Sequence, residues 1–396
     1  MPYKDVLRGH SIFITRIAQI ENQLQPSQPG TTPAKIYYFD VLRTFAAFAV
    51  VIGHVSAWMI YTFPPLVDGR WSIDWSIATF YNSAIRFCLP IFIFVSSAAL
   101  LDPAKQETAK VFFKKRTKRI LVPILFWSIF YTLFKVLFLA DIFYGGKVTA
   151  KALLTDIVEV RIYYHMWYLY VALGFYFLTP FLRTYVRNTP RNKRIKIAIL
   201  MMALGVVAEI FNHIYRQDRH FIFLESIPYL GYYLLGYELT LIERKKINLT
   251  YCTIAMIVSF AVVFFGAFFY VKMWGSWLDT GRDSIFYHQL LPPVIIFSIA
   301  TFLMGYRIWG PTRPEKGMFM NMVKRTMPAT MGIYVLHPFV LEVIRRIVGY
   351  YGVDKKPDVD GLLALIAIPI MSWMTIVICY KITKVLMKIP YLRRIV

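Results

Sequence analysis

Long apolar stretches alternate with short polar segments along most of the chain. Each stretch is long enough for a helix that crosses the hydrocarbon core of a bilayer, which takes about 20 residues. The pattern therefore predicts an all-α fold, a polytopic membrane helix bundle of about ten transmembrane helices at residues 37–61, 76–101, 120–140, 165–185, 195–215, 221–241, 250–271, 285–306, 328–348 and 361–386. The composition agrees, because 58% hydrophobic residues and a mean hydropathy of +0.52 exceed what a globular core needs.

The polar segments differ in charge. The chain has 45 Lys and Arg against 22 Asp and Glu, a net charge of +23. The basic residues gather in alternate segments, at 105–119, 183–196, 244–246, 307–325 and from 381 onward. The positive-inside rule places these segments, and both termini, in the cytoplasm. This division between loops explains the charge without a nucleic-acid partner, so we expect none.

The chain is predicted to have one membrane-embedded domain with short flanking segments. Residues 1–35 lack the apolar core of a signal peptide and form a predicted cytoplasmic extension. Apolar side chains recur at helical spacing between residues 13 and 24, which predicts an interfacial helix with a disordered arm as the alternative, followed by a linker. Residues 36–390 form the membrane domain, and 391–396 form a cytoplasmic tail.

The first predicted span contains ionisable residues that are expensive to bury in a bilayer. Asp40, Arg43 and His54 all lie in this apolar stretch. Ionisable groups inside membrane segments mark functional sites by default. The eleven residues from Arg43 to His54 make about three helical turns, which puts both side chains on one face about 16 Å apart. One face thus carries a cation near one membrane surface and an imidazole deep inside.

Three further spans carry polar groups at similar depth. Arg86 lies four residues before Pro90 in the second span, where the proline frees the Arg86 carbonyl and bends the helix. His165 enters the fourth span and His337 lies within the ninth. Singly, these are also explained by a packing kink, an aromatic belt and a satisfied core histidine. With His54, four groups from four spans converge in the middle or outer half, which favours a site.

Two other features limit the chemistry. The basic stretch that includes Arg116 and Arg119 is a topology anchor, a contact for anionic lipid, or a site for a phosphorylated cytosolic ligand. The three cysteines, Cys88, Cys252 and Cys379, have no CxxC or His-rich spacing. We therefore expect no disulfide and no metal site.

These elements, taken in order, resemble the acyltransferase-3 family of integral membrane O-acyltransferases. The resemblance covers nearly the whole membrane part, and within the family the chain is similar to the O-acetyltransferase of enterobacterial common antigen. Thr44 and Ser97 stand where the family often has Gly, so we expect local helix packing to differ. The matching elements are Asp40-Val-Leu-Arg43 with His54, Arg86-Phe-Cys-Leu-Pro90-Ile-Phe, the basic stretch Phe112 to Pro123, His165-Met-Trp-Tyr-Leu and Gly332-Ile-Tyr334-Val-Leu-His337.

The resemblance implies an O-acyltransferase, most often an O-acetyltransferase, in the bacterial inner membrane. Its partners would be the lipid bilayer, acetyl-CoA or another acyl-CoA as donor substrate, and a glycan or lipid-linked glycan as acceptor. No permanently bound cofactor is implied. The competing hypothesis is a secondary transporter or glycan flippase without thioester chemistry, in which buried His and Arg residues line a proton and substrate path.

Acyl transfer needs a base for the acceptor hydroxyl and positive charge for the carbonyl oxygen. His54 is the candidate base, and direct transfer and a covalent acyl-histidine both remain open. The remaining roles in this hypothesis are stabilisation of the oxyanion or binding of the thioester carbonyl by Arg86, proton relay or acceptor orientation by His337, donor binding by Asp40, Arg43, Arg116 and Arg119, and acceptor binding by His165, Trp167 and Tyr334.

Overall fold

The computed structural model describes most of the chain after the predicted extension. The interfacial helix predicted in residues 1–35 lies outside the described residues. Side chains at 117, 118 and 348–350 are also not described. The described ranges are 37–105, 107–159, 161–215, 226–275, 284–310, 317–350 and 363–396.

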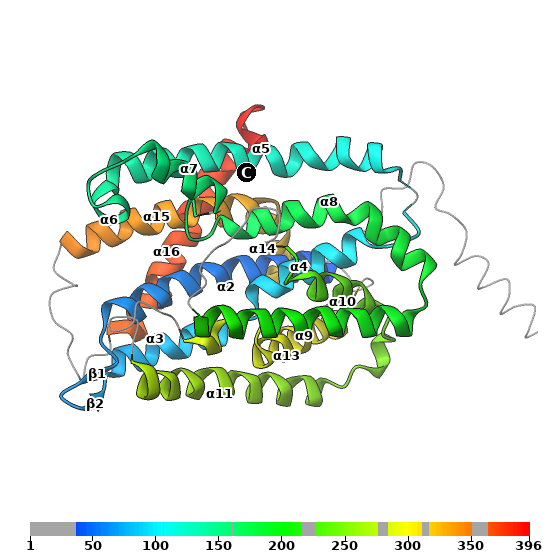
Figure 1. Cartoon of the computed structure of the whole chain (residues 1–396), viewed down its shortest axis with the longest axis horizontal. Helices are drawn as coiled ribbons and strands as arrows, with labels where there is room; N and C mark the ends of the chain where they lie inside the picture. Colours follow the sequence, from blue (N-terminus) through cyan, green and yellow to red (C-terminus); the bar gives the residue numbers. More distant parts are fainter. Residues whose placement is uncertain are drawn as a thin grey trace, which may run out of the picture. The chain divides into compact units, whose positions relative to one another are not determined.

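Helices make up nearly all of the described part (Figure 1). Its one small β-hairpin connects the first described helix to the second. The hairpin pairs Leu66 with Trp71 around Asp68 and Gly69, both at positive φ, as a two-residue Asp-Gly turn requires. The elements are α2 (Tyr37–Thr62), β1 (Leu66–Val67), β2 (Arg70–Trp71), α3 (Ile73–Ala84), α4 (Cys88–Leu100), α5 (Ala109–Phe138), α6 (Ala140–Tyr144), α7 (Ala150–Val158), α8 (Trp167–Asn188), α9 (Arg191–Tyr215), α10 (Leu230–Thr240), η1 (Arg244–Lys246), α11 (Leu249–Trp274), η2 (Ile285–Tyr287), α13 (Pro292–Trp309), α14 (Met318–Thr326), η3 (Met327–Ala329), α15 (Thr330–Tyr350), α16 (Leu363–Leu386) and η4 (Leu392–Arg394).

The predicted all-α membrane bundle is confirmed. In the described part, nine segments are helical, long and apolar enough to cross a bilayer. The sixth predicted span, 221–241, contributes α10, whose 11 residues rise only about 16 Å. That length is short of the ~30 Å hydrocarbon core, and residues 216–225 lie outside the described part.

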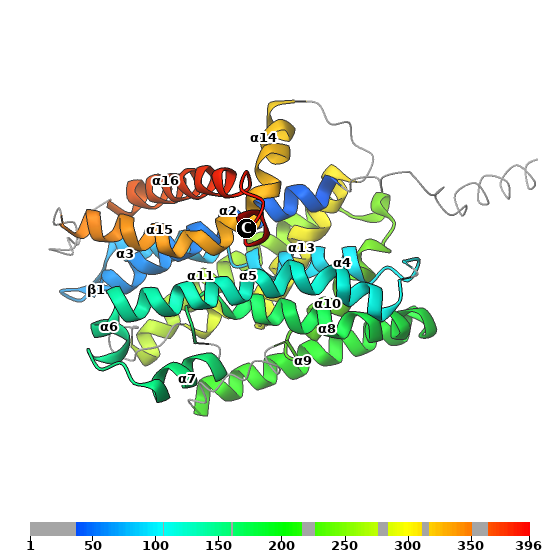
Figure 2. The same cartoon turned by 90° about the horizontal axis from the view of Figure 1, so that it is seen from above.

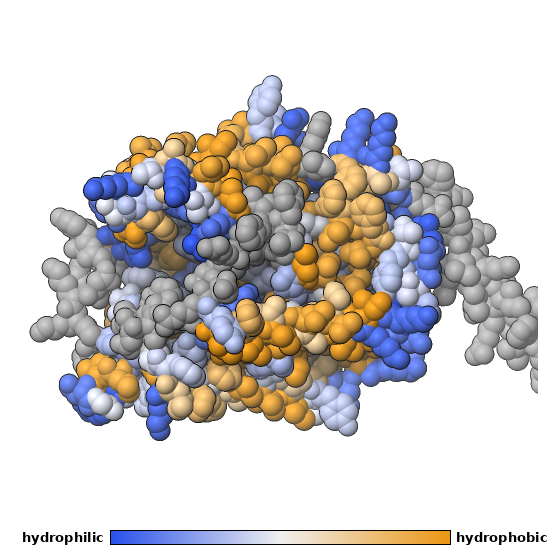
Figure 3. Space-filling view, viewed as in Figure 1, coloured by the Kyte–Doolittle hydropathy of each residue, from blue (hydrophilic) through white to orange (hydrophobic). Residues whose placement is uncertain are grey.

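Helix α2 forms the centre of the bundle. It packs against α3, α4, α15, α16 and α13, and its small residues Ala46, Ala47 and Ala49 allow close helix approach. In the most apolar 18-residue stretch of α2, 56% of the residues are buried, whereas the figure for the corresponding stretch of α9 is 17%. In views at right angles, α9 and α11 lie at the periphery (Figures 1 and 2). Apolar side chains cover the middle of the visible face and hydrophilic ones gather toward its ends, as expected of a surface that meets lipid (Figure 3).

The second span is discontinuous. Helix α3 ends at Ala84 and α4 begins at Cys88, so the bend predicted from Pro90 is a full break, and Arg86 lies within it. A second break separates η2 from α13. Backbone at such breaks is tolerated in membranes where it is buried in protein or lines a cavity.

The two departures from the family pattern are accommodated by local packing. Thr44 is fully buried, and its hydroxyl donates to the Asp40 carbonyl one turn earlier. Beside Ser97, a glycine on the neighbouring helix α10 allows the close approach. A Cβ on Gly236 of α10 would lie 2.7 Å from the Phe94 Cα and 3.0 Å from the Ser97 Cβ. Gly236 thus provides the close approach of α10 to α4 that Ser97 does not.

The two ends of the bundle carry different groups. We call the end with the β1–β2 hairpin, α6 and the last turn of α2 the hairpin end, and the end where α2 begins the basic end (Figure 1). The assignment of the basic end to the cytoplasm remains a prediction from the charge pattern.

Candidate active site

A cavity of about 640 Å³ occupies the hairpin half of the bundle. Its walls come from the second half of α2, the α3–α4 break, the junction of α5 and α6, the segment before α8, and α15. Five of the residues predicted from the sequence line it: His54, Arg86, His165, Trp167 and Tyr334. The volume is in the range of small-molecule sites.

Three histidines from three different segments meet beside this cavity. The His54 ring lies 5.1 Å from the His337 ring, nearly parallel at 25°. His165 lies 5.4 Å from His337, centroid to centroid. His54 is half-buried and lines the cavity, whereas His337 is fully buried behind it. A ligand in the cavity would therefore meet His54 first.

The proline after His337 sets the hydrogen bonding of this histidine. Pro338 has no N–H, so it leaves free the carbonyl of Tyr334, four residues earlier. The Nδ1 of His337 donates to that carbonyl at 2.6 Å. The proton therefore resides on Nδ1, and Nε2 is left as an acceptor. Within the described part, Nε2 is buried without a hydrogen-bond partner.

His165 is held by its backbone. It is 1% exposed, and neither ring nitrogen has a hydrogen-bond partner among the described residues. Its carbonyl accepts a 2.5 Å hydrogen bond from the Tyr334 hydroxyl, and the Tyr131 ring lies edge-on at 4.9 Å. Tyr334 thus joins α15 to the segment before α8, while Trp167 begins α8 and packs 5.6 Å from Tyr229.

Arg86 places a cation in the cavity wall. One terminal nitrogen donates to the Tyr287 carbonyl at 3.1 Å, and the guanidinium lies 4.2 Å above the Tyr287 ring. The Nε atom is buried without a partner, and no ion pair of Arg86 with a carboxylate occurs in the described ranges. Arg86 is close enough to His54 to interact with it electrostatically. Its positive charge is therefore available to a ligand.

The residues predicted to bind a donor lie apart from the cavity. Arg43 has Asp40, Tyr168, Tyr176 and Arg116 as electrostatic neighbours and does not line the cavity. Arg119 is exposed, and of these two arginines it is Arg116 that is an electrostatic neighbour of Arg43 among the described residues. The structure thus brings Arg43, Asp40 and Arg116 together and leaves Arg119 outside this group.

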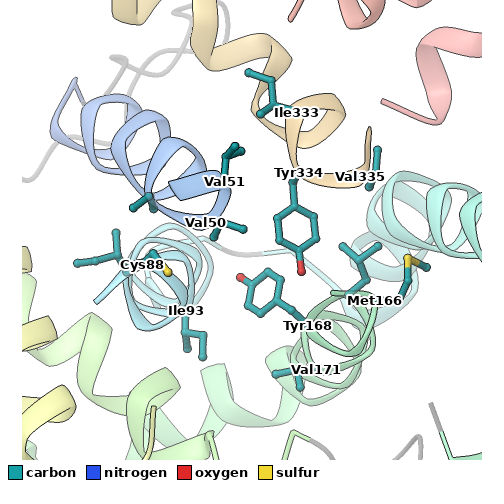
Figure 4. Close-up of a cluster of buried hydrophobic side chains, with 14 of the residues drawn as sticks. Val50, Val51, Cys88, Ile93, Met166, Tyr168, Val171, Ile333, Tyr334 and Val335 are labelled. Carbon is teal, nitrogen blue, oxygen red and sulfur yellow. The ribbon is translucent and has the colours of Figure 1, made fainter. Parts of the chain in front are cut away.

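Two tyrosines link the cavity wall to the surroundings of Arg43, because Tyr334 lines the cavity and Tyr168 is an electrostatic neighbour of Arg43. Figure 4 shows the Tyr168 and Tyr334 side chains among Val50, Cys88 and Met166. The two tyrosine rings lie 5.8 Å apart, and both rings are almost completely buried. Tyr168 is thus the residue that contacts Tyr334 on one side and neighbours Arg43 on the other.

Two residues of the site were not predicted. The Tyr164 ring lies 4.7 Å from His54, and its position next to His165 was a usable signal. Tyr287, which holds Arg86, is 201 residues away in the sequence, and no local pattern indicates it. No group of three His, Cys, Asp or Glu side chains is placed to hold a metal ion within the described ranges, and all three cysteines are free and buried.

Comparison with known proteins identifies the family of the chain. The family model described as an acyltransferase domain matches residues 36–384, which is most of the chain. No curated protein and no solved structure matches it. The family resemblance predicted from the sequence motifs is therefore confirmed. The chain belongs to this acyltransferase family, and it is a multi-pass membrane acyltransferase.

Proposed function

We propose that the protein is an O-acyltransferase, and most specifically an O-acetyltransferase, of the bacterial inner membrane. It would move an acyl group from cytosolic acyl-CoA to a hydroxyl of a cell-surface polysaccharide or lipid-linked glycan. The observation that carries the proposal is the grouping of His54, His337 and Arg86 at one cavity in a chain of this family.

His54 is the proposed general base. A neutral imidazole has an acceptor nitrogen, so it can take a proton from a hydroxyl bound beside it. Its ring lines the cavity, where the acceptor hydroxyl would bind, while His337 lies behind it with an acceptor nitrogen free. We propose that His54 takes the proton from the acceptor hydroxyl. The acceptor nitrogen of His337 would then stabilise the positive charge that His54 carries.

Arg86 is the proposed stabiliser of the oxyanion. When the hydroxyl oxygen attacks the thioester carbon, negative charge develops on the carbonyl oxygen, and a fixed cation lowers the energy of that state. Tyr287 fixes the guanidinium through a hydrogen bond and a ring contact without neutralising it. As the C–O bond forms and the C–S bond breaks, the proton on His54 passes to the departing thiolate. The same groups would serve a covalent acyl-histidine.

The donor is proposed to enter from the basic end. Arg43 and Arg116 would hold its phosphates, and Asp40 would orient Arg43. The rise of about 16 Å between Arg43 and His54 is of the order of an extended pantetheine arm. Tyr168 neighbours Arg43 and contacts Tyr334, which lines the cavity, so we expect the thioester to pass this pair of tyrosines.

The acceptor is proposed to bind among the aromatic residues of the cavity. Trp167 and Tyr164 offer ring faces on which a sugar can stack, and His165 lies between them along the chain. Tyr334 has its hydroxyl engaged with the His165 carbonyl, so its contribution would come from the ring and from holding this segment.

One observation favours the transporter alternative. The two broken spans meet where Arg86 donates to the Tyr287 carbonyl, and discontinuous helices near the bilayer midplane are typical of transporter binding sites. The family match favours the enzyme. The two hypotheses differ in one product, because a transporter leaves the thioester intact.

The test is transfer of labelled acetyl from acetyl-CoA into glycan by membranes that contain the wild type or His54→Ala. We expect transfer by the wild type and its loss in an equally abundant, folded mutant. His213→Ala is the matched control, because His213 lies on α9 against Tyr270, away from the cavity. Full activity of His54→Ala would reject His54 as the base, and intact thioester with all donors and acceptors would favour the transporter.

A further inference from the structure

Lys135 is a buried cation that the proposed chemistry does not use. It lies in the last turn of α5 and is 2% exposed. Removing an ammonium group from water is costly, and a buried ion pair is often no more stable than a well-packed apolar pair. A lysine at this depth therefore calls for a role that an apolar side chain could not fill.

The ammonium group of Lys135 joins α5 to the segments that follow it. It donates to the Asp156 carboxylate on α7 at 2.5 Å and to the Arg161 carbonyl at 3.2 Å. The Tyr144 hydroxyl on α6 donates to the same carboxylate oxygen at 2.7 Å. The rings of Phe143 and Tyr144 lie 4.9 and 5.1 Å from the Lys135 nitrogen. One side chain thus connects α5, α6, α7 and the segment before α8.

Those segments form one wall of the cavity. Ile142 and Phe143 of α6 line it, and so do Tyr163 and Tyr164, which follow Arg161. One turn before Lys135 on α5, the Tyr131 ring stacks 4.5 Å from Tyr163. The segment 161–166 is therefore attached to α5 at two points one helical turn apart, at Lys135 and at Tyr131. Tyr164, which contacts His54, lies in this segment.

We propose that Lys135 is a positioning residue for the acceptor side of the site. Through Asp156 and the Arg161 carbonyl it fixes the wall that carries Tyr163, Tyr164 and His165. The ion pair specifies one arrangement of this wall, whereas an apolar pair would allow several. This role in acceptor binding rests on the proposed acyl transfer, but the attachment of residues 161–166 to α5 does not.

The first measurement is steady-state kinetics of Lys135→Met, Lys135→Arg and the control Lys151→Met in membranes. Lys151 is an exposed lysine on α7. We expect Lys135→Met to raise the acceptor KM about tenfold and leave the donor KM unchanged. Lys135→Arg, which keeps a donor for both partners, should restore most of the acceptor affinity. Equal changes in donor and acceptor KM, or none, would overturn the proposal.

The second measurement does not depend on activity. Hydrogen–deuterium exchange of the full-length protein should be faster at residues 161–166 in Lys135→Met and unchanged in Lys151→Met. If Lys135→Met does not fold, Asp156→Asn takes its place, because Asp156 lies outside the spans with its side chain 20% exposed. Unchanged exchange at 161–166 overturns the positioning role. A wild type that transfers no acyl group but shows the exchange difference rejects the proposed function and leaves the attachment supported.

Discussion

The cavity and the basic end of this bundle hold their polar groups in opposite ways. Beside the cavity, nitrogens of Arg86, His165 and His337 are buried without hydrogen-bond partners in the described part of the chain. At the basic end, cations are directed at backbone carbonyls and carboxylates. Arg183 donates to the Leu100 carbonyl, and Arg194 donates to Glu238 at 2.6 Å. The nitrogens beside the cavity face an open site. At the basic end, Arg183 keeps Nη1 and Nη2 without hydrogen-bond partners in the described part, but it still contacts the Leu100 carbonyl and the Glu107 carboxylate.

This difference distinguishes residues that are kept for a ligand from residues that stabilise the fold. An unpartnered buried polar group costs free energy, so it is retained where a ligand can complete it. A cation at the carbonyl end of a helix satisfies groups that the helix leaves open, and it opposes the helix dipole. Arg183 and Lys105 both donate to carbonyls in the last turn of α4. We therefore expect substitutions beside the cavity to reduce activity and substitutions at the basic end to reduce stability.

Apart from His54→Ala, the largest effect on activity is expected from Arg86→Gln. The substitution removes the uncompensated charge proposed to stabilise the oxyanion, and kcat should fall about 10²- to 10³-fold. The melting temperature in detergent should change little, because the lost contacts are one hydrogen bond and one ring contact. Arg70→Gln, in the exposed strand β2, is the matched control. A large loss of stability with little loss of kcat would reverse the comparison at this residue.

His337→Phe tests whether the histidine behind the cavity contributes more than packing. Phenylalanine keeps a ring that can stack on His54 but has no nitrogen. We expect kcat to fall about 100-fold, the lower end of the effect of acid–base catalysis, because the protonated His54 would lose its supporting nitrogen. Both KM values should stay unchanged. His213→Phe is the control. Wild-type kcat in folded His337→Phe would assign the unpartnered Nε2 no part in the reaction.

The fold followed from the sequence more completely than the site. Apolar length predicted the spans, and the bend at Pro90 was predicted because a proline frees the carbonyl four residues earlier. The same rule applied to Pro338 would have predicted that the Tyr334 carbonyl accepts from His337, since both precede that proline in one turn. The position of Pro338 in the sequence is therefore a local signal for this hydrogen bond.

Contacts between distant segments could not be predicted in this way. Tyr287 meets Arg86 because two breaks in separate spans coincide, and no periodicity reports such a meeting. Arg116 and Arg119 belong to one basic stretch, yet only Arg116 neighbours Arg43. Charge pattern identifies the stretch, and the side of α5 on which each residue lies decides which cation faces the bundle.

Gly236→Ala tests the architectural half of the comparison. The added methyl would lie 2.7 Å from the Phe94 Cα and 2.9 Å from its carbonyl oxygen, so α10 and α4 would have to separate. Overpacking of this kind typically costs about 1–3 kcal/mol. We expect a lower melting temperature in detergent and nearly normal donor and acceptor KM in the protein that remains folded. Ala208→Val, on the exposed surface of α9, should have no such effect. A normal melting temperature for Gly236→Ala would show that this contact is not tightly constrained.

Like Arg183 and Arg307, Arg116 keeps buried hydrogen-bonding capacity at the basic end, and it gives the smallest but most selective prediction. Its Nε is buried without a hydrogen-bond partner within the described ranges, and its guanidinium lies 6.0 Å from the Phe112 ring. As beside the cavity, we infer that the unpartnered Nε of Arg116 is kept for a ligand, here an anion. Arg43, which neighbours Arg116, adds a second positive charge. We expect Arg116→Met to raise the acyl-CoA KM about tenfold, the effect of about 1.4 kcal/mol, while Arg119→Met leaves it unchanged. Equal responses of the two variants would mean that the stretch acts only as a topology anchor or lipid contact, and the basic end would then be architectural throughout.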